Sequence, residues 1–338
     1  MRKLLWIMPN KAKKYSGIYK YNSELISLQK KNKTISILFA GRINNYFFTF
    51  WSKFFYLPFF LLLNSKNFDC IVYPEEGFAF LSIFSSASEN KLIIHDFRKK
   101  FNLKNNVKII EKIKQFYIDL NFLFINNFMK IIVPSVFTKK ILSSSIRAIS
   151  KNIIVIPNII DFKKILNLKN NKFNNLINKK YKIILCVSSN ETRKNVSLIY
   201  QVAKKTNKIK FILVGDFNEN YKKSNIMVFK NLTEGDLAQL FNIADLYLDL
   251  SFFEGFGRTL IEAQQFGLPV LCFNTLINKE ILRSSAYLID KNYNVDQLTN
   301  YISSKSATPQ KKIASIQNSA RYSKKSIYKK FKKEIDEI

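Results

Sequence analysis

Histidine and cysteine are scarce in this chain. Its 338 residues include one histidine, His95, and three cysteines, Cys70, Cys186 and Cys272. A single imidazole excludes a histidine-rich metal centre. Each cysteine stands alone in an apolar run, which indicates neither a disulfide framework nor a zinc knuckle. We therefore expect buried thiols in a reducing compartment, and a cytoplasmic protein.

Acidic residues are also few, with 24 Asp and Glu against 55 Lys and Arg, for a formal net charge of +31. Such a charge attracts nucleic acids, anionic lipids and phosphorylated small molecules. The sequence lacks zinc-finger spacing, an RNA-recognition consensus and a compact helix-turn-helix pattern. Binding to nucleic acid therefore rests on charge alone, and we expect no nucleic-acid partner.

Several catalytic motifs are missing. The chain has no GxSxG elbow, no Walker A loop and no GxGxxG after its first strand-like run. Asp96 directly follows His95, and neighbours on a strand point to opposite faces, which is unsuitable for a catalytic triad. Asp245 and Asp249 bracket a strand-like run and favour a structural role. We expect neither a metal ion nor a cofactor.

One segment, residues 46–63 (YFFTFWSKFFYLPFFLLL), has the length and apolar character of a membrane helix. Lys53 and Pro58 near its middle, and the absence of a second such segment, oppose a membrane span. The short apolar run before Pro9 predicts no signal peptide. We expect a helix or broken helix on the first domain, with apolar surface available to an anionic membrane. A wholly buried core helix is the alternative.

Short apolar runs alternate with longer amphipathic segments along the chain, which predicts parallel sheets covered by helices. A polar, Asn- and Lys-rich stretch at 161–180 resembles an interdomain connection. The predicted class is α/β, with two Rossmann-like, doubly wound domains. We place the first at 1–165 and the second at 166–308, followed by a basic terminal helix at 309–338 that could pack back on the first domain.

The segment 251–273 (SFFEGFGRTLIEAQQFGLPVLCF) gives the most specific chemical signal. A loop with Gly255 and Gly257 follows a strand-like run, and a helix then extends to Gly267. Glycines allow a phosphate to approach the backbone, and a helix N-terminus favours an anion. The pattern predicts a diphosphate site with two nearby carboxylates, Glu254 and Glu262.

The spacing of Glu254 and Glu262 closely resembles the E-x7-E motif of family 4 glycosyltransferases, which are retaining enzymes of the GT-B fold. Further segments are similar to that family in the same order, over most of residues 1–300. They are SGIYKYNSEL at 16–25, FWSKFFYLPFFLLLN at 50–64, KLIIHDF at 91–97, VPSVFTKKIL at 133–142, IPNIIDF at 156–162, CVSSNETRKNV at 186–196 and LFNIADLYLDLS at 240–251.

The resemblance implies an enzyme that moves a hexose or related sugar from a nucleotide diphosphate to a saccharide or lipid-linked acceptor, with retention and without a metal. Glu254 would contact the donor sugar near its anomeric end, and Arg193 and Lys194 would neutralise the leaving diphosphate. His95 would lie near the transferred sugar. The implied donor-binding residues are Glu262, Gly255, Phe256, Gly257, Thr259, Leu260, Ser188 and Gly17.

Two departures from the family pattern leave alternatives open. Ser188 and Ser189 stand where Gly-Arg is common, so Arg193 would have to compensate, and Gly17 stands alone where paired glycines are usual. A catalytically inactive subunit that regulates a partner transferase is therefore a second hypothesis. If the chain is an active enzyme, we expect it to act on precursors of surface polysaccharide or on lipid-linked precursors, at the cytoplasmic face of the inner membrane.

Overall fold

A computed structural model describes residues 2–13, 16–29, 33–41, 45–96, 109–145, 152–162, 172–173, 176, 180–217 and 224–338. The chain forms two compact units, one of residues 1–159 and 327–338 and the other of residues 160–326. Most of the proposed connection at 161–180, and Phe97 of the KLIIHDF segment, lie outside the described residues.

The first unit contains a six-stranded parallel sheet in the order β2-β1-β3-β4-β5-β6. Each strand overlaps a predicted apolar run, although β4 begins two residues before its run, at Glu89. The strands are β1 (Arg2–Met8), β2 (Lys33–Phe39), β3 (Cys70–Tyr73), β4 (Glu89–Ile93), β5 (Lys130–Val133) and β6 (Ile153–Val155).

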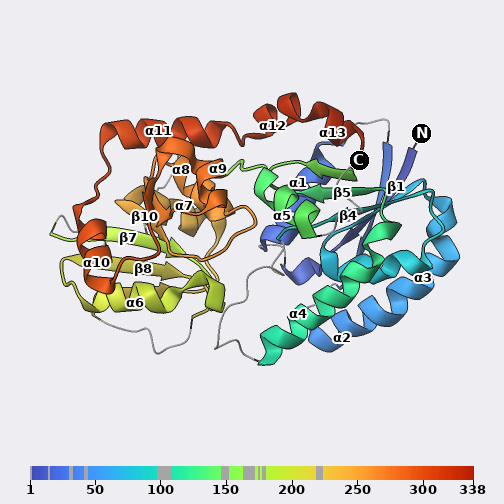
Figure 1. Cartoon of the computed structure of the whole chain (residues 1–338), viewed down its shortest axis with the longest axis horizontal. Coiled ribbons are helices and arrows are strands. Elements are labelled where there is room, and N and C mark those ends of the chain that lie inside the picture. Colours follow the sequence, from blue (N-terminus) through green and yellow to red (C-terminus); the bar gives the residue numbers. More distant parts are fainter. Residues whose placement is uncertain are drawn as a thin grey trace. The chain divides into compact units, whose positions relative to one another are not determined.

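Helices accompany this sheet, as Figure 1 shows. They are α1 (Gly17–Ser27), α2 (Tyr46–Trp51), a π-helical turn η2 (Ser52–Tyr56), α3 (Leu57–Asn64), α4 (Ile109–Asn121), α5 (Val136–Ser145) and α13 (Lys332–Asp336), with short 3-10 segments η1 (Lys11–Lys13), η3 (Ser65–Asn67), η4 (Glu76–Phe84) and η6 (Phe122–Asn127).

Side chains of the sheet alternate between its two faces, as strand geometry requires. Leu5 and Ile7 of β1 join a core cluster with Leu57 and Leu61 of α3. Trp6 is also fully buried, and its indole N–H donates to Asn22 of α1 over 2.8 Å. Both faces of the first sheet are therefore covered, which explains its nearly continuous apolar strands.

The second unit repeats this architecture, with the parallel order β12-β11-β10-β7-β8-β9. The strand order reverses between β7 and β10, so this pair is the topological switch point of a doubly wound sheet. The strands are β7 (Lys182–Val187), β8 (Ile209–Val214), β9 (Ile226–Phe229), β10 (Leu246–Asp249), β11 (Val270–Phe273) and β12 (Tyr287–Ile289).

Four helices of the second unit begin at a residue whose side chain accepts a backbone N–H of the first turn, namely Thr233, Thr275, Asn294 and Thr308. Thr233 and Asp236 form the predicted capping box of α7. The other segments are η9 (Thr192–Lys194), α6 (Val196–Lys204), α8 (Arg258–Gln265), α9 (Leu276–Leu282), η11 (Arg283–Ser285), α10 (Val295–Ser304) and α11 (Pro309–Ala320), with α7 at Glu234–Ile243.

The C-terminal part differs from the single basic helix expected at 309–338. It forms three helices, α11, α12 (Lys324–Lys330) and α13. The last twelve residues belong to the first unit. There the buried Lys91 of β4 pairs with Glu89 and donates to the backbone carbonyls of Glu337 and Ile338. A buried ammonium needs such partners, so these bonds hold the end of the chain against the sheet.

Candidate functional site

Two loops of the second unit meet at the carboxyl ends of β7 and β10. Hydrogen bonds pair these strands side by side, so the segments that follow them emerge at the same edge of the sheet. The backbone N–H of Phe252 donates to the carbonyl of Arg193 over 2.8 Å and joins the two loops. Crevices at switch points of this kind are where doubly wound sheets bind ligands.

The joined loops bring Glu254 together with Lys194 and Arg193. Lys194 Nζ donates to Glu254 Oε1, and Arg193 Nη1 lies 3.1 Å from Glu254 Oε2. All three side chains are nearly buried, with 12 to 15% of their surface exposed. The structure thus places three of the four predicted catalytic residues in one charge cluster.

Arg193 has further partners that fix its guanidinium. Its Nε donates to Glu191 over 2.7 Å, and its Nη1 donates to the carbonyl of Phe253 over 3.1 Å. Glu191 also accepts a hydrogen bond from the Ser189 hydroxyl at 3.1 Å. Ser189 therefore belongs, through Glu191, to the hydrogen-bond network that fixes the guanidinium of Arg193.

Charge pairing determines the protonation states of the cluster. Burial alone would raise the pKa of Glu254, but Lys194 and Arg193 outweigh it and lower that pKa to about 2. Burial lowers the pKa of Lys194, yet Glu254 and Asp249 reverse the shift and raise it. At neutral pH the cluster therefore holds one carboxylate and two cations.

Asp249, at the end of β10, adds a second acidic group beside the cluster. It is buried, and burial raises its pKa, while Lys194 opposes that shift. Its Oδ1 accepts from the backbone N–H of Ser251 over 2.7 Å. Asp245 accepts from the backbone N–H of Ile183 over 2.8 Å, which fits the structural role expected for it.

Helix α8 begins directly after this acidic loop. Its N-cap is Gly257, whose φ of 82° lies in the left-handed region that glycine adopts without strain. The ring of Phe256 packs edge-on against Tyr322, with 5.3 Å between centroids, so only its backbone is available to a ligand. Gly255 precedes these residues, and Thr259 and Leu260 lie in the first turn of α8. The N–H of Leu260 donates to the Gly257 carbonyl over 3.2 Å, so the positive end of the helix dipole, rather than that N–H, favours an anion there.

Glu262 lies one turn further along α8 and is 5% exposed. Arg258 Nε is 3.7 Å from its Oε1, an i,i+4 pair along the helix. Such a pair orients the carboxylate along the helix. Arg258 was not among the residues predicted from the sequence. Its spacing of four residues from Glu262 on a helix is typical of an ion pair.

Backbone hydrogen bonds and a glycine with a positive φ also define the C-terminal end of α8. Gly267 has a φ of 70°, its N–H donates to the Gln264 carbonyl, and the N–H of Leu268 donates to the Ala263 carbonyl. These are the two bonds of a Schellman motif, which ends the helix where the sequence predicted. The Gln264 side chain is buried and bonds to Asn318 of α11 over 2.7 Å.

Ser188 follows β7, and its backbone N–H donates to the carbonyl of Val214 over 2.9 Å. Gly215 passes so close that a Cβ there would lie 1.8 Å from the Ser188 carbonyl oxygen. Only glycine permits this approach, which sets the path of the chain from Ser188 towards Lys194.

The remaining predicted residues, His95 and Gly17, lie in the first unit. Gly17 is the first residue of α1, after the N-cap Ser16. His95 follows β4, with Nε2 2.9 Å from the Pro74 carbonyl and its ring edge-on to Tyr21 at 5.4 Å. Asn22 of α1 also donates to the Pro74 carbonyl. Helix α1 and the ends of β3 and β4 therefore meet around Pro74.

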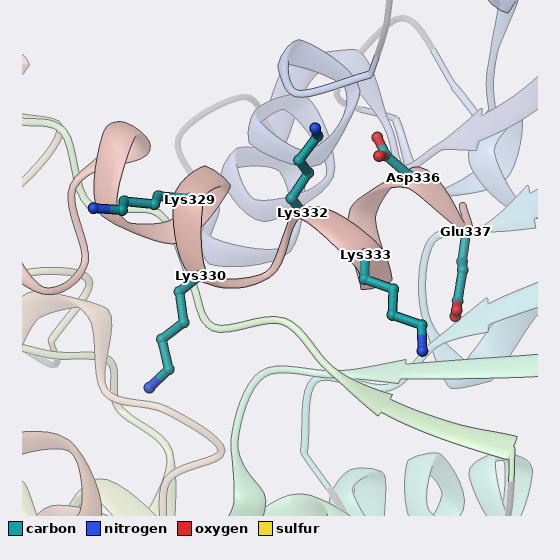
Figure 2. Close-up of a pocket in the computed structure, with 6 residues that line it drawn as sticks. All are labelled: Lys329, Lys330, Lys332, Lys333, Asp336 and Glu337. Carbon is teal, nitrogen blue, oxygen red and sulfur yellow. The ribbon is translucent and has the colours of Figure 1, made fainter.

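The described residues form a shallow pocket but no cluster of metal ligands. Within the described residues, no group of three or more His, Cys, Asp or Glu side chains could hold a metal ion. A shallow pocket near the C-terminus is lined by Lys329, Lys330, Lys332, Lys333, Asp336 and Glu337. Figure 2 shows its four lysine side chains pointing in different directions, so they do not converge on one anion.

Sequence comparison links the second unit to a known family. Residues 168–322 match the model of glycosyl transferases group 1. This region contains the charge cluster and α8. A search of curated proteins finds no match. The second unit thus carries the sequence pattern of group 1 glycosyl transferases.

Solved structures resemble the chain over its full length at low identity. Anabaena HepE, solved with UDP-glucose, has a TM-score of 0.75 at 16% identity and 100% coverage of both chains. Sucrose-phosphate synthase from Thermosynechococcus elongatus has 0.73 at 11%, covering 100% of this chain and 99% of that one. WaaG, a glycosyltransferase involved in lipopolysaccharide biosynthesis, has 0.67 at 14%, covering 99% of each. The predicted GT-B fold, with two parallel six-stranded sheets flanked by helices, is confirmed.

Proposed function

We propose that this chain is a retaining glycosyltransferase that transfers a sugar from a nucleotide diphosphate to an acceptor hydroxyl. The observation that carries the proposal is the cluster of Lys194, Arg193 and Glu254 at the switch point of the second sheet, directly before the N-terminus of α8. The match of this unit to group 1 glycosyl transferases supports it. So does the UDP-glucose that HepE binds.

The proposed site residues would contact different parts of the donor molecule. The first-turn N–H groups of α8 and the cations of Lys194 and Arg193 would bind the diphosphate and stabilise it as it leaves with the bonding electrons. Glu254 would place a fixed negative charge beside the cationic sugar. Glu262 would accept hydrogen bonds from hydroxyls of the ribose.

No divalent ion is required in this mechanism, because the two cations and the helix N-terminus can offset the charge of the diphosphate. The acceptor is proposed to be a saccharide or lipid-linked oligosaccharide of a surface polysaccharide. The part that WaaG plays in lipopolysaccharide biosynthesis supports this class of acceptor.

A direct test combines binding and turnover. Calorimetry with UDP and a panel of nucleotide sugars should detect binding, and the preferred donor should be hydrolysed slowly without an acceptor. Lys194→Gln should weaken binding roughly ten- to hundredfold, the effect of losing one charge-assisted hydrogen bond. Lys230→Gln is the matched control, because Lys230 pairs with the exposed Asp216 on the surface of the same unit.

The rival hypotheses give different results. Donor binding without hydrolysis or transfer, for any nucleotide sugar, would favour the inactive regulatory subunit that Ser188 and Ser189 suggested. Absence of nucleotide binding, together with salt-sensitive binding to duplex DNA or RNA, would favour the nucleic-acid hypothesis.

A further inference from the structure

We infer that the first unit docks on the surface of an anionic bilayer through two neighbouring helical segments that lie in the membrane plane. One segment runs from α2 through η2 to α3, and the other from α4 into η6. The outward apolar side chains of these segments are called the two-helix face below. This inference concerns a surface of the first unit and does not depend on the proposed function.

The first segment is apolar on its outer side along its whole length. Residues 46–67 form a helix long and apolar enough to cross a membrane, and 17% of its apolar stretch is buried. Ten large apolar side chains of this segment are exposed. They are Tyr46, Phe47, Phe48, Phe50, Trp51, Phe55, Tyr56, Phe59, Leu62 and Leu63.

Lys53, the one charged residue of residues 46–64, is turned away from this surface. It lies in the π-helical turn η2. Its Nζ lies 3.9 Å from the centroid of the Phe78 ring and 5.1 Å from that of Tyr117. These contacts are cation–π interactions within the unit. The outer side of the segment is therefore free of charge, although its sequence contains a lysine.

The second segment extends the apolar surface in a way that the sequence did not predict. Ile113, Phe116, Leu120 and Leu123 are 43 to 72% exposed. Their spacings of three and four residues place them on one side of a helix. The Phe54 ring lies between the two segments, 6.0 Å from that of Tyr117 on α4. Figure 1 likewise shows α2 beside α4.

The composition of the two-helix face fits a lipid surface. Of the 22 large hydrophobic side chains exposed among the described residues, 14 belong to it. Trp51, Tyr46 and Tyr56 have the amphipathic rings that prefer the bilayer interface. Lys66 and Lys112 are exposed at the ends of α3 and α4. The net charge of +31 adds long-range attraction to anionic headgroups and opposes contact with a second copy of the chain.

An in-plane orientation follows from the inner side of the first segment. Leu57 and Leu61 are fully buried and belong to the core of the first unit. A membrane span would withdraw both leucines from that core and move Lys53 into hydrocarbon. An in-plane helix keeps these contacts and buries the outer side chains at the boundary between headgroups and acyl chains.

Tryptophan fluorescence can test the inference without any enzyme assay. The chain has two tryptophans, of which Trp6 is fully buried and Trp51 is half exposed. Vesicles containing phosphatidylglycerol should shift the Trp51 emission to the blue. Lipids brominated near the headgroup should quench it more than lipids brominated near the chain ends. Neutral phosphatidylcholine vesicles should bind the protein more weakly.

Three matched substitutions locate the contact. Leu62→Asp and Leu123→Asp test one segment each, and Leu276→Asp is the control because Leu276 is 65% exposed in the second unit. Each of the first two should weaken vesicle partitioning about tenfold or more, because it places a charge in the buried apolar area. The control should bind like the wild type, with circular dichroism confirming the fold of all three.

Specific results would overturn the inference. An unshifted Trp51 emission with anionic vesicles at low salt would exclude lipid docking. Strongest quenching from bromines at the chain ends would indicate a membrane span. A dimer by analytical ultracentrifugation that Leu62→Asp dissociates would assign the face to a second copy of the chain.

Discussion

Glu254, on the loop after β10, forms ion pairs with Arg193 and Lys194, which lie on the segment after β7. Its Oε2 lies 3.1 Å from Arg193 Nη1, while its Oε1 accepts from Lys194 Nζ. The carboxylate therefore holds the loop after β10 to the segment after β7. Its charge serves the structure of the loops as well as the proposed chemistry, and a substitution affects both.

Replacing Glu254 by glutamine should lower kcat roughly 100-fold or more. The charge beside the cationic sugar is lost, and single electrostatic contacts to a transition state are worth about this much. The KM for the donor should stay unchanged or fall, because Lys194 and Arg193 no longer share their charge with a carboxylate. Steady-state kinetics measures both quantities.

Folding must be controlled in this variant, because removing one partner of a buried ion pair costs about 3–5 kcal/mol. Thermal melts of Glu254→Gln and of the double variant Lys194→Met/Glu254→Gln separate stability from catalysis. A folded Glu254→Gln enzyme with wild-type kcat and KM would contradict the role given to this carboxylate.

Replacing Glu262 by glutamine should mainly raise the KM for the donor, by roughly ten- to hundredfold, because a charged hydrogen-bond partner of the ribose is lost. Arg258→Met should shift KM in the same direction with kcat retained, since Arg258 contacts and orients Glu262. Lys279→Met, on the exposed side of α9, is the control. A fall in kcat at constant KM for Glu262→Gln would argue against ribose binding.

Turnover should persist in excess EDTA. Lys194, Arg193 and the first turn of α8 lie together at the site and can offset the charge of a diphosphate without a divalent ion. The measurement compares initial rates with EDTA, with added Mg²⁺ and with added Mn²⁺. An activity that EDTA abolishes and that only a divalent ion restores would refute this expectation.

Much of the architecture could be predicted from local sequence patterns. The central strands β3, β10 and β11 coincide with apolar runs, because strands buried on both faces need apolar side chains throughout. The two ends of α8 could also be predicted from the sequence, since Gly257 and Gly267 take positive φ angles that glycine adopts without strain. The positions of Glu254 and Glu262 relative to that helix followed from these limits.

Contacts between separate loops could not be predicted in the same way. Arg193 donates to the carbonyl of Phe253, on the loop after β10, through side-chain geometry that a sequence pattern does not record. Lys53 points inward from a π-helical turn, and its partner Tyr117 lies on α4, which is far away in the sequence. Such features arise when tertiary packing selects one rotamer among several.

The charge cluster should also produce a distinctive dependence of stability on pH. Lys194 and Arg193 lower the pKa of Glu254 to about 2, from an ordinary value of 4.5, despite the opposing effect of burial. A carboxylate with a lowered pKa stabilises the fold fully above its ordinary pKa and loses that contribution as the pH falls towards the folded value. The contribution should therefore disappear between about pH 4.5 and pH 2.

Urea unfolding of the wild type and of Glu254→Gln at a series of pH values measures this contribution. A shift of this size corresponds to roughly 3 kcal/mol, so the free energy of unfolding of the wild type should fall more steeply across that window. Lys194→Met should flatten the wild-type slope as well, because Lys194 is the largest cause that lowers this pKa. Identical slopes for all three proteins would mean that Glu254 is not paired as the structure places it.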